Sequence, residues 1–244
     1  MFTRWIGAIA VTLGLAAGVS AGPIGQSALG IDKDVQILSH TFNVLNGGSF
    51  YAIVDGFDTQ VFCVDNQNHV YVPDEYLADV VALSDWDSTD QSHVRKGNNT
   101  TWPGLDAGYN GATALQRYQA AAWLVSQYSA FPSGTGTANG NDQALQTAIW
   151  YLLYQGTGGA PALNSTSKGY AESALDAVFA NPTFGFYQWA IISGEANGGG
   201  RLLNSTKQTF LVQLDPSGDT PTPEPATYAF LGAGLIAMAL FRKR

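Results

Sequence analysis

Sulfur is scarce in this sequence, which contains one cysteine, Cys63, and two methionines, Met1 and Met238. A single cysteine cannot form an internal disulfide framework or a zinc site built from several cysteines. Because both methionines lie near the ends of the chain, its central part carries one sulfur atom. A lone thiol in such a chain is either a buried, inert side chain or has a chemical task.

Positive charge is also scarce, since 11 Lys and Arg residues stand against 19 Asp and Glu residues, for a net charge of −8. A nucleic-acid-binding protein needs a basic surface, so this balance excludes that class. Charged residues make up only 12% of the chain and aromatic residues another 12%, which excludes a disordered polyelectrolyte. We therefore expect one folded, acidic domain with no nucleic-acid partner.

Local signatures of catalysis and metal binding are missing as well. The chain has three histidines, none of them in an H-E-x-x-H pattern, and it has no G-x-S-x-G elbow. We therefore expect no catalytic residue, no metal site and no cofactor, and we predict that the protein is not an enzyme. The acidic residues Asp85, Asp87 and Asp90 leave two interpretations open, a calcium site that is not an EF-hand or a solvated acidic loop.

The N-terminal residues 1–21 have the pattern of a secretory signal peptide. Arg4 supplies the positive charge, residues 5–17 form an apolar run, and small residues precede a cleavage point ahead of Gly22. The alternative is an N-terminal membrane anchor, for which the apolar run is short. We therefore expect export across the inner membrane.

The C-terminus combines an apolar run, residues 226–241, with the basic cluster Arg242-Lys243-Arg244. As a helix the run would be about 24 Å long, slightly short for a bilayer of about 30 Å. A basic cluster stays on the cytoplasmic side of a membrane. On this pattern alone the segment is either a membrane tether or a sorting signal.

The motif Pro223-Glu224-Pro225 directly before that run makes the C-terminus resemble the PEP-CTERM sorting signal. The resemblance implies recognition by an exosortase in a Gram-negative envelope, with transient anchoring in the inner membrane through the C-terminal helix. It also implies display at the cell surface or in the exopolysaccharide matrix. The chain then divides into a signal peptide (1–21), an exported body (22–216), a Pro-rich spacer with the motif (217–225) and a hydrophobic helix with a basic end (226–244).

The body begins with strand patterns and continues with helical ones. β-branched and aromatic residues predict strands over residues 35–46, 49–54, 59–65, 183–192 and 208–214. Apolar residues at helical spacing predict helices over 112–129 and 142–155, with a third over 170–179. This order predicts an α+β fold, with a mainly antiparallel β body, two or three inserted helices and a final strand that pairs with the early sheet. The C-terminal hydrophobic sorting helix is additional.

Cys63 and Gln146 are the two residues that stand out in the body. Cys63 lies in VFCVD, inside a predicted strand, and Gln146 lies in LQTAIW, inside a predicted helix. Ile149, Trp150 and Leu153 follow Gln146 at helical spacing, which places the amide on an apolar, buried stripe. The polar atoms of a buried amide need hydrogen-bond partners.

These two motifs together resemble the bacterial thioester domain, in which a strand cysteine and the glutamine of a T-Q-x-A-I-W helix condense with loss of ammonia. Here Leu145 replaces the usual threonine, while the remaining motif residues match. The resemblance implies a thioester-domain-like fold, with Cys63 as the thiol, Gln146 as the acyl donor, and Ile149 and Trp150 as an apolar pocket that excludes water. It also implies covalent attachment to an amine or hydroxyl on a surface ligand or exopolysaccharide.

Two other functions stay open at this point. Cys63 packed as a small apolar side chain would make the body a non-reactive structural or carbohydrate-interacting matrix protein of the same fold. An enzyme that acts on extracellular polysaccharide is the third interpretation, although no pair of carboxylates is distinguished by its sequence context.

Overall fold

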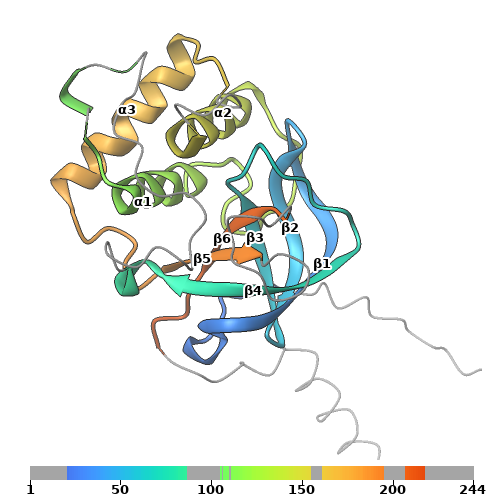
Figure 1. Ribbon diagram of the computed structural model, residues 1–244. Coiled ribbons are helices and arrows are strands. Elements are labelled where there is room, and N and C mark those ends of the chain that lie inside the picture. The colour runs from blue at the N-terminus through green and yellow to red at the C-terminus, as the bar shows by residue number, and fades with distance from the viewer. Residues whose placement is uncertain are drawn as a thin grey trace, which may run out of the picture. The chain divides into compact units, whose positions relative to one another are not determined.

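The strands of this chain form a closed β-barrel. The computed structural model describes residues 21–86, 105, 107–109, 111–154, 161–194 and 207–217, all of which belong to one compact unit, Ala21–Pro221. The described residues form a closed barrel of six strands and three α-helices. Figure 1 shows the barrel with the helices grouped beside it.

All neighbouring strands of the barrel are antiparallel. The strands are β1 (Gly30–Val44), β2 (Gly47–Val54), β3 (Phe57–Cys63), β4 (Asp74–Ala82), β5 (Trp189–Gly194) and β6 (Thr209–Gln213). Their order around the barrel is β1-β2-β3-β6-β5-β4, and β4 pairs again with β1. Closure leaves none of the six strands as an unpaired edge.

Two tight turns build the first half of the barrel. Leu45 and Asn46, with φ of 55° and 66°, connect β1 to β2, and Asp55 and Gly56, with φ of 48° and 87°, connect β2 to β3. Two consecutive residues with positive φ are typical of the type I′ turn, whose twist matches that of paired strands. The first turn therefore lies one residue earlier than Asn46-Gly47-Gly48 suggests, and both glycines belong to β2.

Alternate side chains of each strand point into the barrel, because successive residues of a strand face opposite sides. On β3, Val61 and Cys63 belong to the interior cluster, whereas Phe62 belongs to a second cluster beneath the helices. The interior cluster is completed by buried residues of the other strands, among them Val35, Ile37, Phe50, Ala52, Val54, Ala78, Val80, Ile192, Phe210 and Val212. Cys63 thus faces the barrel interior.

The α-helices are α1 (Ala114–Val125), α2 (Gly140–Tyr154) and α3 (Ser165–Ala180), and short 3-10 turns span Gln26–Ala28, Leu83–Asp85 and Ala107–Tyr109. Thr113 caps α1 and Asn164 caps α3, each by accepting a hydrogen bond from a backbone N–H of the first turn. For α2 the Asn139 side chain accepts from the N–H groups of Asn141 and Asp142. Asn141 itself lies within the helix.

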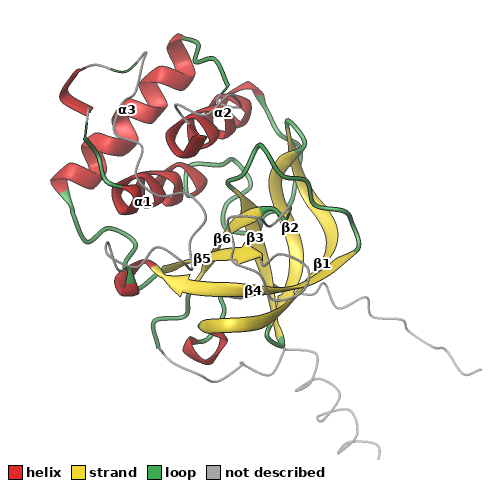
Figure 2. Ribbon diagram, in the orientation of Figure 1, coloured by secondary structure: helices red, strands yellow, loops and turns green. Residues whose placement is uncertain are grey.

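The three helices pack on one another and on one side of the barrel, as Figure 2 shows. Leu124 of α1, Leu152 of α2 and Leu175 of α3 share one buried cluster with Phe62 of β3 and Leu211 of β6. The barrel therefore has two apolar layers, its own interior and the outer face that the helices cover. α2 contributes to both, since Trp150 packs against both clusters.

The predicted fold class, an α+β and thioester-domain-like body, was wrong, because the described residues form a closed six-stranded antiparallel barrel with three helices. Closure requires β1 to pair with β4 and β3 to pair with β6. Side-chain alternation indicates which face of a strand is buried, but it does not indicate which strands pair across long stretches of sequence. The expected pairing of the last strand with the early sheet is confirmed, since β6 lies against β3.

The predicted terminal segments lie largely outside the described residues, which exclude residues 1–20 and 218–244. Within the described ranges, no helix is both long enough and apolar enough to cross a bilayer. The predicted strand over residues 183–192 begins only at Trp189, because residues 182–188 form turns.

Replacing Phe210 with alanine is expected to lower the free energy of unfolding by about 3–5 kcal/mol. Phe210 is fully buried in the barrel interior, where its ring meets Phe50 edge-on at a centroid distance of 5.6 Å. Urea denaturation of the full-length chain measures the change. Tyr187→Ala is the control, because this side chain is 69% exposed and its loss should change stability by less than about 0.5 kcal/mol. Equal losses in both variants would contradict the interior position of Phe210.

Candidate functional site

The carboxamide of Gln146 is fully buried where α2 meets the barrel. Its Nε2 donates a hydrogen bond to the carbonyl oxygen of Cys63 at 3.1 Å. Its Oε1 accepts two hydrogen bonds, from the Gly48 N–H and from the Tyr128 hydroxyl, each at 2.8 Å. The amide nitrogen therefore lies against the end of β3, and the carbonyl is polarised by two donors.

Cys63 ends β3 and its side chain is closed to solvent. The thiol donates to the carbonyl oxygen of Asp65 at 3.2 Å, and the Gln208 amide nitrogen donates to the sulfur at 2.9 Å. Burial raises the pKa of Cys63 to about 12, and the charge of Asp65 adds to the rise, whereas a backbone hydrogen bond at Asp65 and the side chain of Trp150 oppose it. The thiol is therefore protonated at neutral pH.

Trp150 follows Gln146 by one helical turn and covers the site. It is half-buried and packs against both the barrel interior and the cluster beneath the helices. Ile149 is fully buried in the cluster beneath the helices. Trp150 thus borders the barrel interior that contains Cys63, whereas Ile149 belongs to the other cluster.

Gly47 and Gly48 allow the backbone of β2 to approach the carboxamide. A Cβ atom at Gly47 would lie 2.8 Å from Cζ2 of Trp150 and 3.0 Å from Oε1 of Gln146. Gly48 has a φ of +93°, and a Cβ atom there would lie 1.9 Å from the carbonyl oxygen of Phe42. Only glycine fits at these positions without displacing its neighbours. The Gly-Gly pair thus brings the Gly48 N–H to Gln146.

Asp142 ties the segment that carries Tyr128 to α2. Its carboxylate accepts hydrogen bonds from the N–H and the hydroxyl of Ser129, both at 2.8 Å. Ser129 directly follows Tyr128, and Asp142 lies one helical turn before Gln146. The Tyr128 ring also meets Phe42 edge-on, at a centroid distance of 5.7 Å. These contacts fix the Tyr128 hydroxyl relative to the carboxamide.

Burial raises the pKa of Tyr128 well above its ordinary value, and the neighbouring Cys63 and Asp142 raise it further. The Tyr128 hydroxyl therefore keeps its proton and acts as a hydrogen-bond donor to Gln146.

The structure brings together Cys63, Gln146 and Trp150 among the residues that the sequence singled out. It adds three residues that the sequence reasoning missed: Gly48, Tyr128 and Gln208. Glycine inside a strand often marks close backbone approach, so Gly48 carried a signal in the sequence. Tyr128 and Gln208 carried none, because their roles depend on contacts between distant segments.

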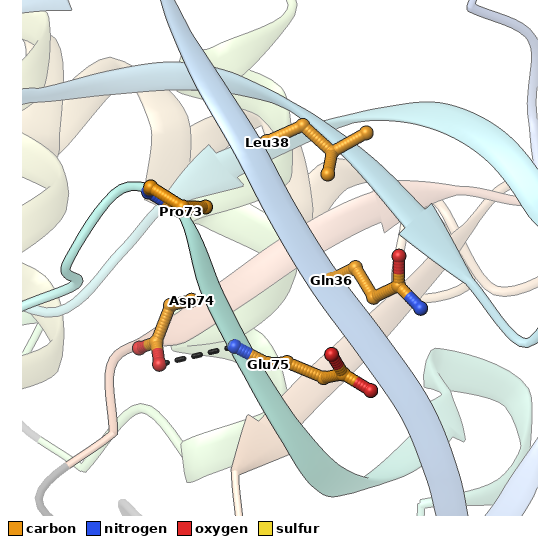
Figure 3. A pocket seen from close by; sticks show the side chains of 5 residues that line it. All are labelled: Gln36, Leu38, Pro73, Asp74 and Glu75. Atoms are coloured by element: carbon orange, nitrogen blue, oxygen red, sulfur yellow. Dashed lines mark hydrogen bonds between the residues drawn. The ribbon is translucent and has the colours of Figure 1, made fainter.

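A surface depression among the described residues lies elsewhere on the barrel. Figure 3 shows this depression between β1 and β4, with a volume of about 270 Å³, lined by Gln36, Leu38, Pro73, Asp74 and Glu75. A smaller one of about 190 Å³ lies among residues 181–188. Neither contains Cys63 or Gln146, so the buried site opens into neither of them.

Several predicted residues lie outside the described part of the chain: Asp87, Asp90, Pro223, Glu224, Pro225, Arg242, Lys243 and Arg244. Within the described part, no group of three or more His, Cys, Asp or Glu side chains is placed to hold a metal ion. Asp85 is described and is a hydrogen-bond acceptor for its neighbour Ser84.

Residues 221–244 match the PEP-CTERM protein-sorting motif. The motif implies processing by an exosortase, export and sorting to the cell surface. Neither the curated proteins nor the solved structures contain a match to this chain. The match covers the C-terminal segment alone, so the function of the barrel has to be argued from its own contacts.

The chain with a free Cys63 thiol is expected to lose stability as the pH rises above about 9. The folded thiol keeps its proton up to a pKa of about 12, whereas an unfolded cysteine titrates near about 8.5. Between these values the folded state binds one more proton, so the free energy of unfolding falls by about 1.4 kcal/mol per pH unit.

Urea denaturation at several pH values above neutrality measures this fall, on chains shown by intact mass to carry the free thiol. The Cys63→Ala variant lacks the titrating group and should lose less stability over the same range. Parallel curves for the two proteins would contradict the buried, protonated thiol.

Replacing Gly47 with alanine is expected to destabilise the chain by about 1–3 kcal/mol, because the added methyl group overpacks Trp150 and the carboxamide. Gly140→Ala is the matched control, since a Cβ atom at Gly140 meets nothing within 4 Å and alanine favours a helix. Urea denaturation compares the two. Unchanged stability of the Gly47→Ala chain would contradict the close approach of β2 to α2.

Proposed function

We propose that this exported, exosortase-sorted surface protein forms an internal thioester between Cys63 and Gln146 and uses it once to attach covalently to a surface ligand. The main support is the position of the Gln146 carboxamide, whose nitrogen lies 3.1 Å from the Cys63 carbonyl oxygen and whose oxygen has two donors. Both side chains are fully buried. This function does not require the thioester-domain fold that the sequence suggested.

Formation of the thioester is a transfer of the Gln146 acyl group. The Cys63 sulfur bonds to Cδ of Gln146, the bond from Cδ to Nε2 breaks, and the thiol proton leaves with the nitrogen as ammonia. Because the thiol is neutral at pH 7, it is a weak nucleophile. A carbonyl that is polarised by two donors, on a side chain hydrogen-bonded to the Cys63 backbone, compensates for this weakness through orientation and electrostatic stabilisation.

The thioester then reacts with an amine or hydroxyl of a ligand, on exopolysaccharide or on another cell surface. The nucleophile bonds to Cδ of Gln146, the bond to sulfur breaks, and the proton of the nucleophile is transferred to Cys63. The product is an amide or an ester between Gln146 and the ligand. The reaction happens once in each chain, so it is anchoring rather than enzymatic turnover.

Water slowly hydrolyses an exposed thioester, so burial would protect the bond until a ligand arrives. Cys63 and Gln146 are closed to solvent, and Trp150 is the half-buried side chain over them. Trp150 and Ile149 form an apolar pocket that keeps water away from the thioester. A ligand reaches the bond only when it fits closely enough to displace these side chains.

The terminal segments complete the proposal. Residues 1–21 direct export as a signal peptide, and residues 226–244 hold the chain transiently in the inner membrane of a Gram-negative cell. Release by the exosortase then places the body at the cell surface or in the extracellular matrix. The net charge of −8 keeps such a protein soluble and away from anionic polymers.

Intact-mass spectrometry of the full-length chain tests the proposal, because thioester formation lowers the mass by about 17 Da, the mass of one ammonia. Methylamine should then add to Gln146 and release one titratable thiol. Peptide mapping identifies the modified residue.

Two variants serve as controls for this measurement. Cys63→Ala and Gln146→Met should each keep their full mass and take up no methylamine. A wild-type chain with full mass, a titratable thiol and no methylamine uptake would contradict the proposed thioester. The protein would then be a non-reactive matrix protein, or an enzyme if it turned over a polysaccharide.

A further inference from the structure

Two glutamine side chains converge on Cys63, but only one of them has a polarised carbonyl. Gln146 Oε1 accepts hydrogen bonds from Gly48 and Tyr128, each at 2.8 Å. Gln208 places its amide nitrogen 2.9 Å from the sulfur, yet its buried Oε1 has no hydrogen-bond partner among the described residues. Contact with the sulfur favours Gln208 as acyl donor, whereas polarisation of the carbonyl favours Gln146.

We infer that the Gly48 N–H and the Tyr128 hydroxyl form an oxyanion-binding pair that makes Gln146, and not Gln208, the acyl donor to Cys63. The inference rests on the proposed thioester and names the groups that drive its formation. When the sulfur bonds to Cδ of Gln146, the electrons of the C=O double bond move onto Oε1. Two donors at 2.7–3.1 Å stabilise such an oxyanion, and the observed distances lie in that range.

Tyr128 is suited to this role because its hydroxyl is both fixed and protonated. The Asp142 carboxylate holds the adjacent Ser129 through two hydrogen bonds, and the Tyr128 ring is held against Phe42. Fixed donors need no reorganisation when charge develops on the oxygen. Removal of the hydroxyl alone leaves the ring and its packing in place.

Gly48 supplies the second donor from the backbone. Its N–H reaches Gln146 only because Gly47 and Gly48 carry no side chain that would separate β2 from α2. The same two donors face the carbonyl oxygen of the finished thioester. They therefore act twice, once when ammonia leaves and once when an amine or hydroxyl attacks.

Gln208 has a different task, which is to position the sulfur. Its Nε2 donates both to the Cys63 sulfur at 2.9 Å and to the carbonyl oxygen of Asp65 at 2.8 Å. The thiol itself donates to that same oxygen. With no donor on its own Oε1 among the described residues, the Gln208 carbonyl has nothing to stabilise a negative charge.

Refolding of the full-length chain from urea into mild detergent sets the starting time for measuring the reaction rates. Intact mass at successive times gives the rate of ammonia loss, and methylamine uptake gives the rate of attack on the finished thioester. In the Tyr128→Phe variant both rates should fall by about 100-fold, the effect of removing one oxyanion donor. Tyr51→Phe is the matched control, since its hydroxyl donates to Asp58 on the barrel, away from Cys63, and both rates should stay at wild-type values.

The outcomes separate this inference from the proposed function. A wild-type chain that never loses ammonia would overturn both. Wild-type rates in a Tyr128→Phe chain with an unchanged unfolding midpoint would overturn the oxyanion pair alone and leave the thioester standing.

The choice of acyl donor has its own variants. Gln208→Leu should still lose ammonia and take up methylamine at Gln146, although more slowly because the sulfur loses a positioning hydrogen bond, whereas Gln146→Leu should do neither. If the Gln146→Leu chain lost ammonia and its peptide map joined Cys63 to Gln208, the selection of Gln146 would be wrong.

Discussion

The polar atoms of a buried carboxamide need hydrogen-bond partners. In this protein the hydrogen bonds of the Gln146 carboxamide connect α2 to the barrel. Gln146 donates to β3 through the Cys63 carbonyl and accepts from β2 through Gly48 and from the segment after α1 through Tyr128. Loss of one such partner leaves a buried polar group unsatisfied, at a cost of about 1–3 kcal/mol. These three hydrogen bonds depend on the packing of α2 on the barrel and on the close approach that Gly47 and Gly48 allow. They also depend on the hydrogen bonds from Ser129 to Asp142, which hold the segment that carries Tyr128.

In the proposed thioester chemistry, the hydrogen bonds that satisfy Gln146 as a structural group also prepare it as an electrophile. Donors on a carbonyl oxygen stabilise the folded state, and the same donors favour negative charge on that oxygen when a nucleophile adds. The Cys63 thiol is protonated, because burial raises its pKa to about 12. In the proposed reaction the driving force therefore comes from orientation and from the carbonyl, since little thiolate is present at neutral pH.

Much of the local structure could be predicted from sequence periodicity and turn chemistry. The helical spacing of the apolar residues after Gln146 predicted a helix over residues 142–155, and α2 spans Gly140–Tyr154. The strand over residues 208–214 corresponds to β6, Thr209–Gln213. Barrel closure could not be predicted, because the pairing of β1 with β4 joins residues about 45 positions apart and depends on the complementarity of whole strands. In the site, Cys63 and Gln146 stood out by residue type, whereas Tyr128 and Gln208 did not.

The amino-acid sequence by itself determined the sorting motif, the scarcity of sulfur that isolates Cys63, and the placement of Gln146 on an apolar helical stripe. These properties depend on residue type and on spacing along one segment. The tertiary structure alone decided that the strands close into a barrel, that Gly48 and Tyr128 donate to Gln146, and that Gln208 contacts the Cys63 sulfur. The physical reason is that hydrogen bonds between distant segments depend on how the segments pack, and no local pattern of residues specifies their distance or direction.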